Sequence, residues 1–188
     1  MMSVGKLIYG LAVSVLILAT GQAEAQIRPD SKFIKSIEEK NYGEAYSYLV
    51  NGGNPNARDY DGTPALFVAA DIQDRGMINE LLKQGANPNL KDRVSGETPM
   101  MRSAARGDTF SVELILAYEG KIDLEDGRGE TALIKAVQGG YFNVVKVLLD
   151  NNADFDFADY AGLSAFDYAR NGRDKRILKL IQGAAAGK

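Results

Sequence analysis

The sequence of 188 residues contains no cysteine, no histidine and no tryptophan. Without cysteine or histidine, the chain has no disulfide framework, no thiolate nucleophile, no imidazole base and none of the common zinc sites. Positive charge is also scarce. The 22 Lys and Arg face 25 Asp and Glu, and the net charge of -3 gives no broad positive field for a phosphate backbone. We therefore expect no cofactor, no metal and no nucleic-acid partner.

The first 25 residues differ in composition from the rest. Lys6 is a positive charge ahead of an apolar stretch of 14 residues, 7–20, and Ala23 and Ala25 give the small-x-small pattern that signal peptidase cleaves. The stretch is shorter than the roughly 20 residues that span a bilayer comfortably. The pattern predicts a signal peptide over residues 1–25, cleaved before Gln26.

A chain without cysteine suits an oxidising compartment, because no thiol can mispair. We therefore expect a periplasmic or secreted protein, periplasmic if the source is Gram-negative, with no membrane contact after cleavage. An uncleaved signal that anchors the chain to the inner membrane is the alternative. N-terminal sequencing distinguishes the two.

The remaining chain repeats itself every 33 or 34 residues. Gly62, Gly96, Gly129 and Gly162 mark the period, and each follows an aspartate by three or four residues. Such a period is typical of stacked repeat architectures, in which each unit buries its apolar face against its neighbours.

Within each period the apolar spacing is helical. Leu133, Ala136 and Val137 follow the i, i+3, i+4 pattern, and residues 144–149 form a second, wider apolar face. Gly140 separates the two helices, since glycine adopts positive φ at low cost. Each unit is therefore predicted to be a helix-turn-helix hairpin. Asn152 is the expected left-handed cap where other units carry glycine.

These motifs resemble the ankyrin repeat, whose pattern runs Asp-x-x-Gly-x-Thr-Pro-Leu, Ala-Ala and then Leu-Leu-x-x-Gly-Ala-Asp. The chain carries Gly-Glu-Thr-Pro-Met at residues 96–100, Gly-Glu-Thr-Ala-Leu at 129–133 and Leu-Leu-Lys-Gln-Gly-Ala-Asn at 81–87. The resemblance implies an all-α ankyrin-repeat solenoid of about five helix-turn-helix repeats with β-turn fingers. It covers residues 26–58, 59–91, 92–125, 126–158 and 159–182, in which the first and last are caps, and leaves 183–188 as a flexible tail.

Some positions depart from the family pattern. Pro64 stands where the pattern has Thr, and the loop 92–96 carries one extra residue, which predicts a longer fingertip. The histidine after Thr-Pro-Leu is absent, with Phe67, Met101, Ile134 and Asp167 in its place. These departures affect the turns and leave the predicted fold unchanged.

The resemblance also implies that a concave face, formed by fingertips and first helices, holds a protein partner. The positions that the fold leaves free on this face are the candidate contact residues: Tyr60, Asp61, Asp71, Ile72, Arg93, Val94, Arg106, Arg128, Glu130, Gln138 and Tyr160.

The role of these residues stays open at this point. Tyr60 and Tyr160 either anchor a partner or lie against the neighbouring finger. The mixed charges form either a binding strip or an ordinary solvated face, and Asp126 is expected to be a solvated turn former. Exposed Ile72 and Val94 favour a binding site, provided that they lie together.

The sequence thus predicts an exported, monomeric binding module that is not an enzyme. It would act as a scaffold for an envelope or stress-response protein or as an inhibitor such as an immunity protein. A small-ligand binder or enzyme that uses Asp71, Glu130 and the neighbouring arginines is the alternative. It would need a closed pocket.

Overall fold

The computed structural model describes residues 29–186. The predicted signal segment 1–25, the cleavage point before Gln26 and the last two residues lie outside this range, so export stays a prediction. Among the described residues, no helix combines the length and apolar character needed to cross a membrane.

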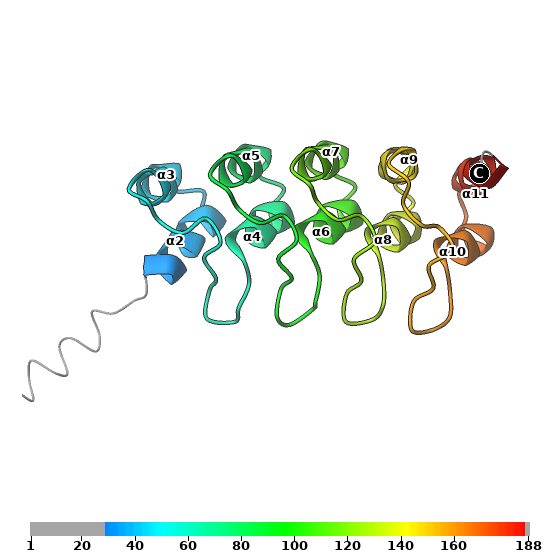
Figure 1. The fold of residues 1–188 in the computed structure, drawn as a ribbon, viewed down its shortest axis with the longest axis horizontal. Coiled ribbons are helices and arrows are strands. Elements are labelled where there is room, and N and C mark those ends of the chain that lie inside the picture. The colour runs from blue at the N-terminus through cyan, green and yellow to red at the C-terminus, as the bar shows by residue number, and fades with distance from the viewer. Residues whose placement is uncertain (1–28, 187–188) are drawn as a thin grey trace, which may run out of the picture.

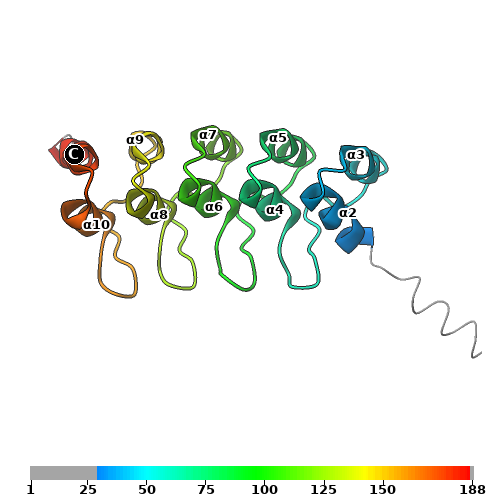
Figure 2. The same ribbon diagram turned by 180° about the vertical axis from the view of Figure 1, so that it is seen from behind.

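The described chain forms five helical hairpins that stack side by side in sequence order, as two opposite views show (Figures 1 and 2). The predicted all-α stack is confirmed. The hairpins are α2 (Pro29–Glu38) with α3 (Tyr42–Val50), α4 (Ala65–Asp71) with α5 (Arg75–Lys83), α6 (Pro99–Ala105) with α7 (Thr109–Ala117), α8 (Ala132–Gly139) with α9 (Phe142–Asp150), and α10 (Ala165–Asn171) with α11 (Lys175–Ala186).

The first helices of the hairpins form an inner row, and the second helices form an outer row (Figure 1). A long loop ahead of each inner helix except α2 projects away from the outer row as a finger. We number the fingers by their units. They are finger 2 (residues 57–64), finger 3 (90–98), finger 4 (124–131) and finger 5 (157–164).

Side-chain caps fix where the inner helices begin. Thr98, Thr131 and Ser164 each accept a hydrogen bond from the backbone N–H three residues later. Pro64 stands at the equivalent place before α4 and makes no side-chain cap. The replacement of threonine at this position therefore removes one hydrogen bond and leaves the helix in place.

Left-handed residues end the helices as the sequence predicts. Gly140 closes α8 with φ 71°, and Asn152, after α9, has φ 64°. Finger 3 is longer by one residue, since the Gly96 N–H reaches the carbonyl of Asp92, four residues back. In finger 4 the Gly129 N–H reaches Asp126, three residues back.

Small residues let the inner helices approach closely. Ala69, Ala104, Ala136 and Ala169, one from each of the four inner helices α4 to α10, are fully buried. One continuous core runs through the stack, and larger side chains of both rows fill it, among them Leu66, Ile78, Met100, Val112, Leu133, Val145 and Ile177. Each unit therefore depends on its neighbours for burial.

The two ends of the stack present polar residues, as predicted for caps. The exposed set comprises Lys35, Glu38, Glu39 and Lys40 at one end and Arg173, Lys175, Arg176 and Lys179 at the other. The predicted tail from residue 183 differs from the structure, because α11 continues to Ala186. Ala184 packs against the core, which extends the helix beyond the family-based boundary.

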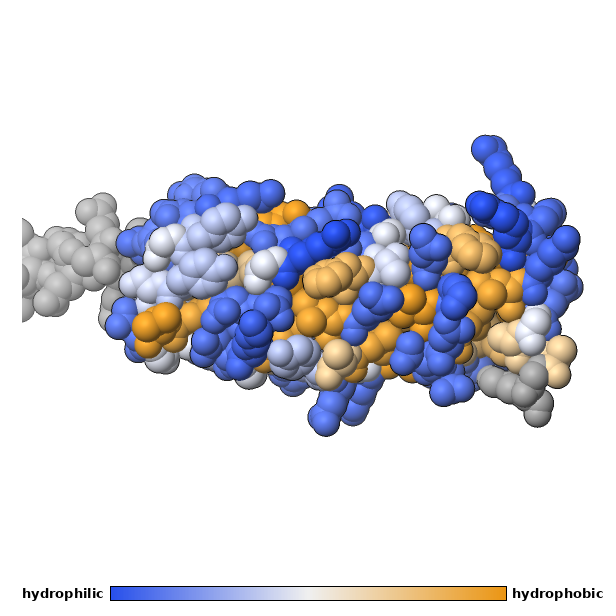
Figure 3. All heavy atoms as spheres, turned by 90° about the horizontal axis from the view of Figure 1, so that it is seen from above, coloured by the Kyte–Doolittle hydropathy of each residue, from blue (hydrophilic) through white to orange (hydrophobic). Residues whose placement is uncertain are grey.

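The outer row carries apolar side chains scattered between polar ones, as seen from above in Figure 3. Val50 on α3 is 79% exposed and Phe110 on α7 is also exposed. Single exposed apolar residues are ordinary on a protein surface.

Candidate functional site

Three large side chains project from the fingertips into solvent. Tyr60 of finger 2, Val94 of finger 3 and Tyr160 of finger 5 are 70%, 81% and 71% exposed. Asp61 and Arg93 beside them are exposed too. The extra residue of finger 3 lies next to Val94, so the longer loop and the most exposed of these side chains coincide. We call Tyr60, Asp61, Arg93, Val94 and Tyr160 the fingertip edge.

Successive fingers are joined through their backbones. The Gly127 N–H donates to the Ser95 carbonyl over 3.1 Å, and the Tyr160 N–H donates to the Arg128 carbonyl over 3.0 Å. The Tyr160 ring lies against Gly129, where an added Cβ would stand 2.5 Å from the ring Cδ1. Tyr160 therefore packs on the neighbouring finger and keeps most of its surface in solvent, so both interpretations of this residue hold in part.

Fingers 2 and 3 are joined differently. Arg58 donates to the Lys91 carbonyl over 2.9 Å and also to the Gly62 carbonyl. The aliphatic part of Arg93 covers Gly62, where a Cβ would collide with it. The finger row is therefore a set of interlocked loops whose tips have fixed positions.

Behind the fingers, a buried lysine collects three carboxylates. The Lys135 Nζ, on α8, lies 2.8 Å from Glu97 Oε1, 2.8 Å from Asp126 Oδ2 and 3.0 Å from Glu130 Oε2. All four side chains are buried. We call these four residues the Lys135 cluster. It joins finger 3, finger 4 and α8.

Lys135, Asp126 and Glu130 are charged at neutral pH. Burial alone would lower the pKa of Lys135, but hydrogen bonds to Asp126, Glu97 and Glu130 outweigh it and raise this pKa above the usual value. Burial would raise the pKa of Asp126, but hydrogen bonds from Lys135 and from the Arg128 and Glu130 amides lower it. In the same way, hydrogen bonds from Gln138 and Lys135 outweigh burial and lower the pKa of Glu130.

Neighbouring arginines extend the cluster along the inner row. The Arg128 Nη2 lies 2.6 Å from Glu130 Oε2, and the Arg102 Nη2 lies 2.7 Å from Glu97 Oε2. Gln138 donates to Glu130 Oε1 over 2.9 Å. These groups close the cluster toward solvent.

A second ion-paired group lies between α4 and α6. The Arg106 Nη2 lies 2.6 Å from Asp71 Oδ1, and the Arg102 Nε lies 3.4 Å from the same atom. Because Arg102 contacts both groups, the pairs form one network. Its four acidic and four basic members balance in charge: Asp71, Glu97, Asp126 and Glu130 against Arg102, Arg106, Arg128 and Lys135.

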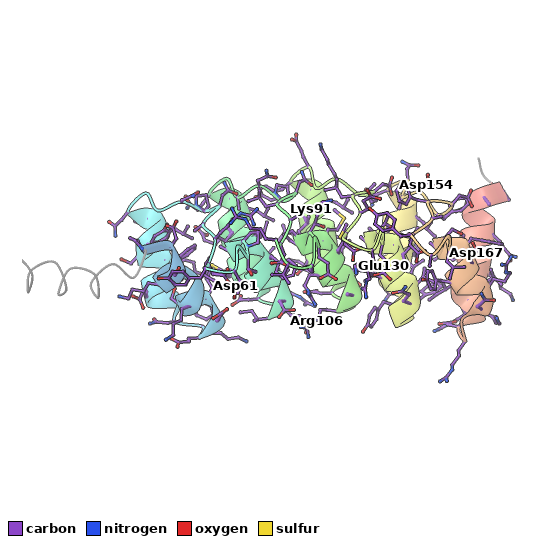
Figure 4. All side chains as sticks on the ribbon, turned by 90° about the horizontal axis from the view of Figure 1, so that it is seen from below. Asp61, Lys91, Arg106, Glu130, Asp154 and Asp167 are labelled. Atoms are coloured by element: carbon purple, nitrogen blue, oxygen red, sulfur yellow. The ribbon has the colours of Figure 1, made fainter. Side chains whose placement is uncertain are left out.

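Figure 4 places this network relative to the edges of the stack, seen from the finger side. Asp61 and Arg106 lie toward one long edge, Lys91 and Asp154 toward the other, and Glu130 between them. Fingers therefore cover the middle of the network, while Arg106 lies toward the edge.

Comparison with known proteins identifies the repeat. The family model for ankyrin repeats, in three copies, matches residues 66–159 and 100–185. The chain belongs to the ankyrin-repeat family. Ankyrin repeats generally mediate protein–protein interaction.

Known relatives are similar to this ankyrin chain over part of their length. Glycerophosphocholine phosphodiesterase gde1 of Schizosaccharomyces pombe is 33% identical over 100 residues, 53% of this chain and 9% of the relative. The mitochondrial disaggregase of Bos taurus is 30% identical over 155 residues, 80% of this chain and 22% of the relative. A putative ankyrin repeat-containing protein of Treponema pallidum is 25% identical over 152 residues, 81% of this chain and 51% of the relative. The chain thus spans about half of these relatives or less.

The ankyrin pattern misplaces some of the candidate contact residues. Glu130 was expected to be free for a partner. It is instead buried, because it forms an ion pair with Lys135 on α8, the helix that follows finger 4. Asp126, expected to be solvated, is buried for the same reason. Ile72 is only partly exposed and packs against the core.

Other predicted contact residues are exposed but already engaged. Arg106 pairs with Asp71, Arg128 pairs with Glu130, and Gln138 donates to Glu130. The two carboxylates of the small-ligand alternative, Asp71 and Glu130, are thus both ion-paired within the ankyrin stack. Among the predicted contact residues, those of the fingertip edge are exposed and make no side-chain ion pair or hydrogen bond within residues 29–186.

The sequence reasoning missed Lys135, the centre of the network. Its signal was present, since a lysine interrupts the apolar run of α8 between Leu133 and Val137. Two glutamates spaced by one repeat, Glu97 and Glu130, precede it. A lysine at a core position together with acids at equivalent places in adjacent ankyrin repeats predicts a buried ion pair between units.

Proposed function

We propose that this protein is an exported binding module that holds a protein partner along the fingertip edge. The observation that carries the proposal is the set of exposed side chains Tyr60, Val94 and Tyr160, on fingers whose loops contact one another. Tyrosine and arginine are the residues that most often anchor interfaces, and Arg93 lies on the same fingertip edge. Apolar surface held rigidly in solvent costs little further ordering when a partner binds.

The inner row supports the edge in this proposal. A partner that used Asp71, Arg106, Arg128, Glu130 or Gln138 would have to break ion pairs or hydrogen bonds within the chain. Glu130 is buried, so the loss of its partners would leave an uncompensated charge, which is costly, whereas breaking the half-exposed Asp71–Arg106 pair would cost less. We therefore propose that the charge network and Ile72 fix the finger geometry, and that the partner contacts the tips.

Capture of the partner tests the fingertip edge. The tagged protein would be crosslinked in its native extract, beside a variant with Tyr60→Ser, Val94→Ser and Tyr160→Ser. The matched control is Val50→Ser with Phe110→Ser, which removes exposed apolar groups from the outer row. We expect the fingertip variant to lose the partner and the control to keep it. Capture by the fingertip variant at the wild-type level would contradict the proposal.

The export part of the proposal rests on the signal pattern of residues 1–25. The test is N-terminal sequencing of the protein from an envelope fraction. A start at Gln26 supports the exported module, and a start at Met1 in a membrane fraction supports the anchored alternative. The captured partner then separates the two roles, since an inhibitor suppresses its partner's activity and a scaffold leaves that activity intact.

A further inference from the structure

Fingers 4 and 5 each rest on the finger before them in the same way. In fingers 4 and 5, the residue after the first aspartate donates its N–H to the residue before the glycine of the preceding finger: Gly127 to Ser95 and Tyr160 to Arg128. The Tyr160 ring also covers Gly129, a position with φ 76° that leaves no room for a Cβ. Fingers 3 and 4 thus each offer a backbone carbonyl and a glycine without a side chain to the finger that follows.

Finger 2 also has the edge that faces the preceding finger in fingers 4 and 5. Among residues 29–186 no finger precedes it, because the first described unit begins at α2. Tyr60 occupies the place of Tyr160 in its finger. Within the described part of the chain, its N–H has no acceptor, its hydroxyl has no partner, and the Asp61 carboxylate has no partner either. The edge that is paired elsewhere in the stack is therefore open here.

A groove of about 570 Å³ lies at this edge, between α2 and finger 2. Its charged lining residues are Lys32, Lys35, Glu38, Glu39, Glu44, Asp59 and Asp61, which sum to a net charge of -3. The two lysines are paired, Lys32 with Glu44 at 2.5 Å and Lys35 with Glu39 at 3.6 Å. Glu38, Asp59 and Asp61 keep no basic partner among the described residues, so the groove favours positive charge.

We propose that this groove receives a basic, glycine-containing loop of a partner protein, which takes the place that a preceding finger holds beside fingers 4 and 5. The loop carbonyl accepts the Tyr60 N–H, its glycine lies under the Tyr60 ring, and a lysine or arginine beside that glycine faces Asp61 and Glu38. The added backbone pairing is a form of β-augmentation. The inference rests on the proposed function, of which it specifies the N-terminal end.

A second copy of this chain fits the groove less well. Finger 5 also has an open side, since nothing lies within 4 Å of a Cβ built at Gly162. However, an inner helix follows every finger, and α10 of a second copy would need the space that α2 fills where it packs on α4. A slender loop avoids this clash.

The test uses a fluorescent peptide cyclised through its ends, with Lys-Arg-Gly-Lys at its turn, and a matched peptide with alanine for the glycine. We expect saturable binding to the purified protein, a shift of the Tyr60 amide resonance, and binding at least about tenfold weaker for the alanine peptide. Asp61→Lys is expected to weaken binding at least about tenfold. The charge-matched control Asp156→Lys, at an exposed acid of the loop before finger 5, should bind within about twofold.

Equal affinity for the two peptides, or equal weakening by Asp61→Lys and Asp156→Lys, would overturn the proposal. So would self-association of the protein that Tyr60→Ala abolishes, because a second copy would then be the occupant. The partner-capture experiment uses Val94 and Tyr160 as well and does not involve the peptide. A negative titration with positive capture would therefore remove this inference and leave the proposed function standing.

Discussion

The Lys135 ammonium lies 2.8 Å from the Asp126 carboxylate, and both side chains are almost completely excluded from water. Asp126 lies in finger 4, and Lys135 lies in α8, the helix that follows this finger. Glu97, from finger 3, reaches the same ammonium. One amine therefore fixes a finger to its own helix and to the neighbouring unit.

Replacing Lys135 by methionine should destabilise the protein strongly. The change keeps an apolar stem on α8 but leaves Glu97, Asp126 and Glu130 buried without the shared cation. We expect the free energy of unfolding to fall by about 3 kcal/mol, as for other buried ion pairs that lose one partner. Urea denaturation followed by circular dichroism measures it.

The matched control is Lys146→Met, which removes an exposed i,i+4 pair with Asp150. It should cost less than about 1 kcal/mol. Similar losses in the two variants would show that the buried cluster adds nothing beyond a surface pair.

The stability of the protein should depend on pH at both ends of the scale. Asp126 and Glu130 have pKa values below their ordinary 3.8 and 4.5, so their contribution is complete above those values and is lost as pH falls through the folded pKa values. The pKa of Lys135 is raised above 10.5, so its contribution is complete below 10.5 and is lost as pH rises through the folded pKa. We expect a plateau between about pH 5 and pH 10 in urea-derived free energies of unfolding. A free energy of unfolding that increases as the pH is lowered from 5 to 3 would contradict this assignment.

In the Lys135→Met variant, the effect of acid on the free energy of unfolding should be the opposite of that in the wild type. Without the amine, burial raises the pKa values of the cluster carboxyls, so protonation favours the folded state. Its free energy of unfolding should increase from pH 7 to pH 5, over a range where the wild-type value is flat. A flat profile for the variant would show that Arg102 and Arg128 suffice to keep the carboxylates charged.

Gly129→Ala should cost more than Gly162→Ala, although both glycines have positive φ of 76° and 78°. Each change pays about 1 kcal/mol of backbone strain. At Gly129 the new methyl group also meets the Tyr160 ring at 2.5 Å and the Tyr160 nitrogen at 2.9 Å, whereas nothing lies within 4 Å at Gly162. Thermal melts of the two variants compare them directly. Equal shifts in Tm would show that the two fingers do not rest on each other in solution.

Asp108→Ala should be more disruptive than Asp74→Ala, although both aspartates cap an outer helix. Asp108 is buried, accepts from the Ser111 hydroxyl over 2.6 Å, and pairs with Arg75 of the preceding unit at 2.8 Å. Its loss combines a cap with an ion pair between units, for about 2 to 3 kcal/mol. Asp74 caps α5 and accepts an exposed hydrogen bond from the Tyr42 hydroxyl over 2.6 Å, so its loss should cost about 1 to 1.5 kcal/mol. Urea denaturation measures both. A loss of about 1 kcal/mol in each variant would limit Asp108 to capping.

The fold could be predicted because its determinants are local. Gly140 and Asn152 end helices through their own backbone preferences, and the alanines of the inner row mark close helix approach at fixed spacing. The longer finger 3 follows from counting residues between Asp92 and Gly96. None of these features depends on a contact that the repeat pattern leaves unspecified.

The site was harder to predict because its contacts run between units. The ankyrin pattern marks Glu130 as a variable position. Glu130 is buried because it pairs with Lys135 on the following helix, and the pattern does not specify that lysine. Tyr60 and Tyr160 occupy equivalent positions in the sequence, yet among residues 29–186 a preceding finger lies beneath the Tyr160 ring and none lies beneath the Tyr60 ring. The difference arises because finger 2 is the first finger among the described residues, and the sequence of a single repeat does not specify its place in the stack.

The balanced charge network also constrains how this protein could have changed length. Repeat arrays commonly gain and lose units by duplication and deletion, because one interface resembles the next. Here Glu97 in the third unit and Lys135 in the fourth are complementary. Removing residues 92–125 would take away Glu97 together with Arg102 and Arg106, which leaves the network unbalanced. Inserting a generic unit between the third and fourth units would separate Glu97 from the Lys135 amine. The order of these two middle repeats is thus fixed by electrostatics, and unit-swapping experiments should succeed only when the pair is moved as a block.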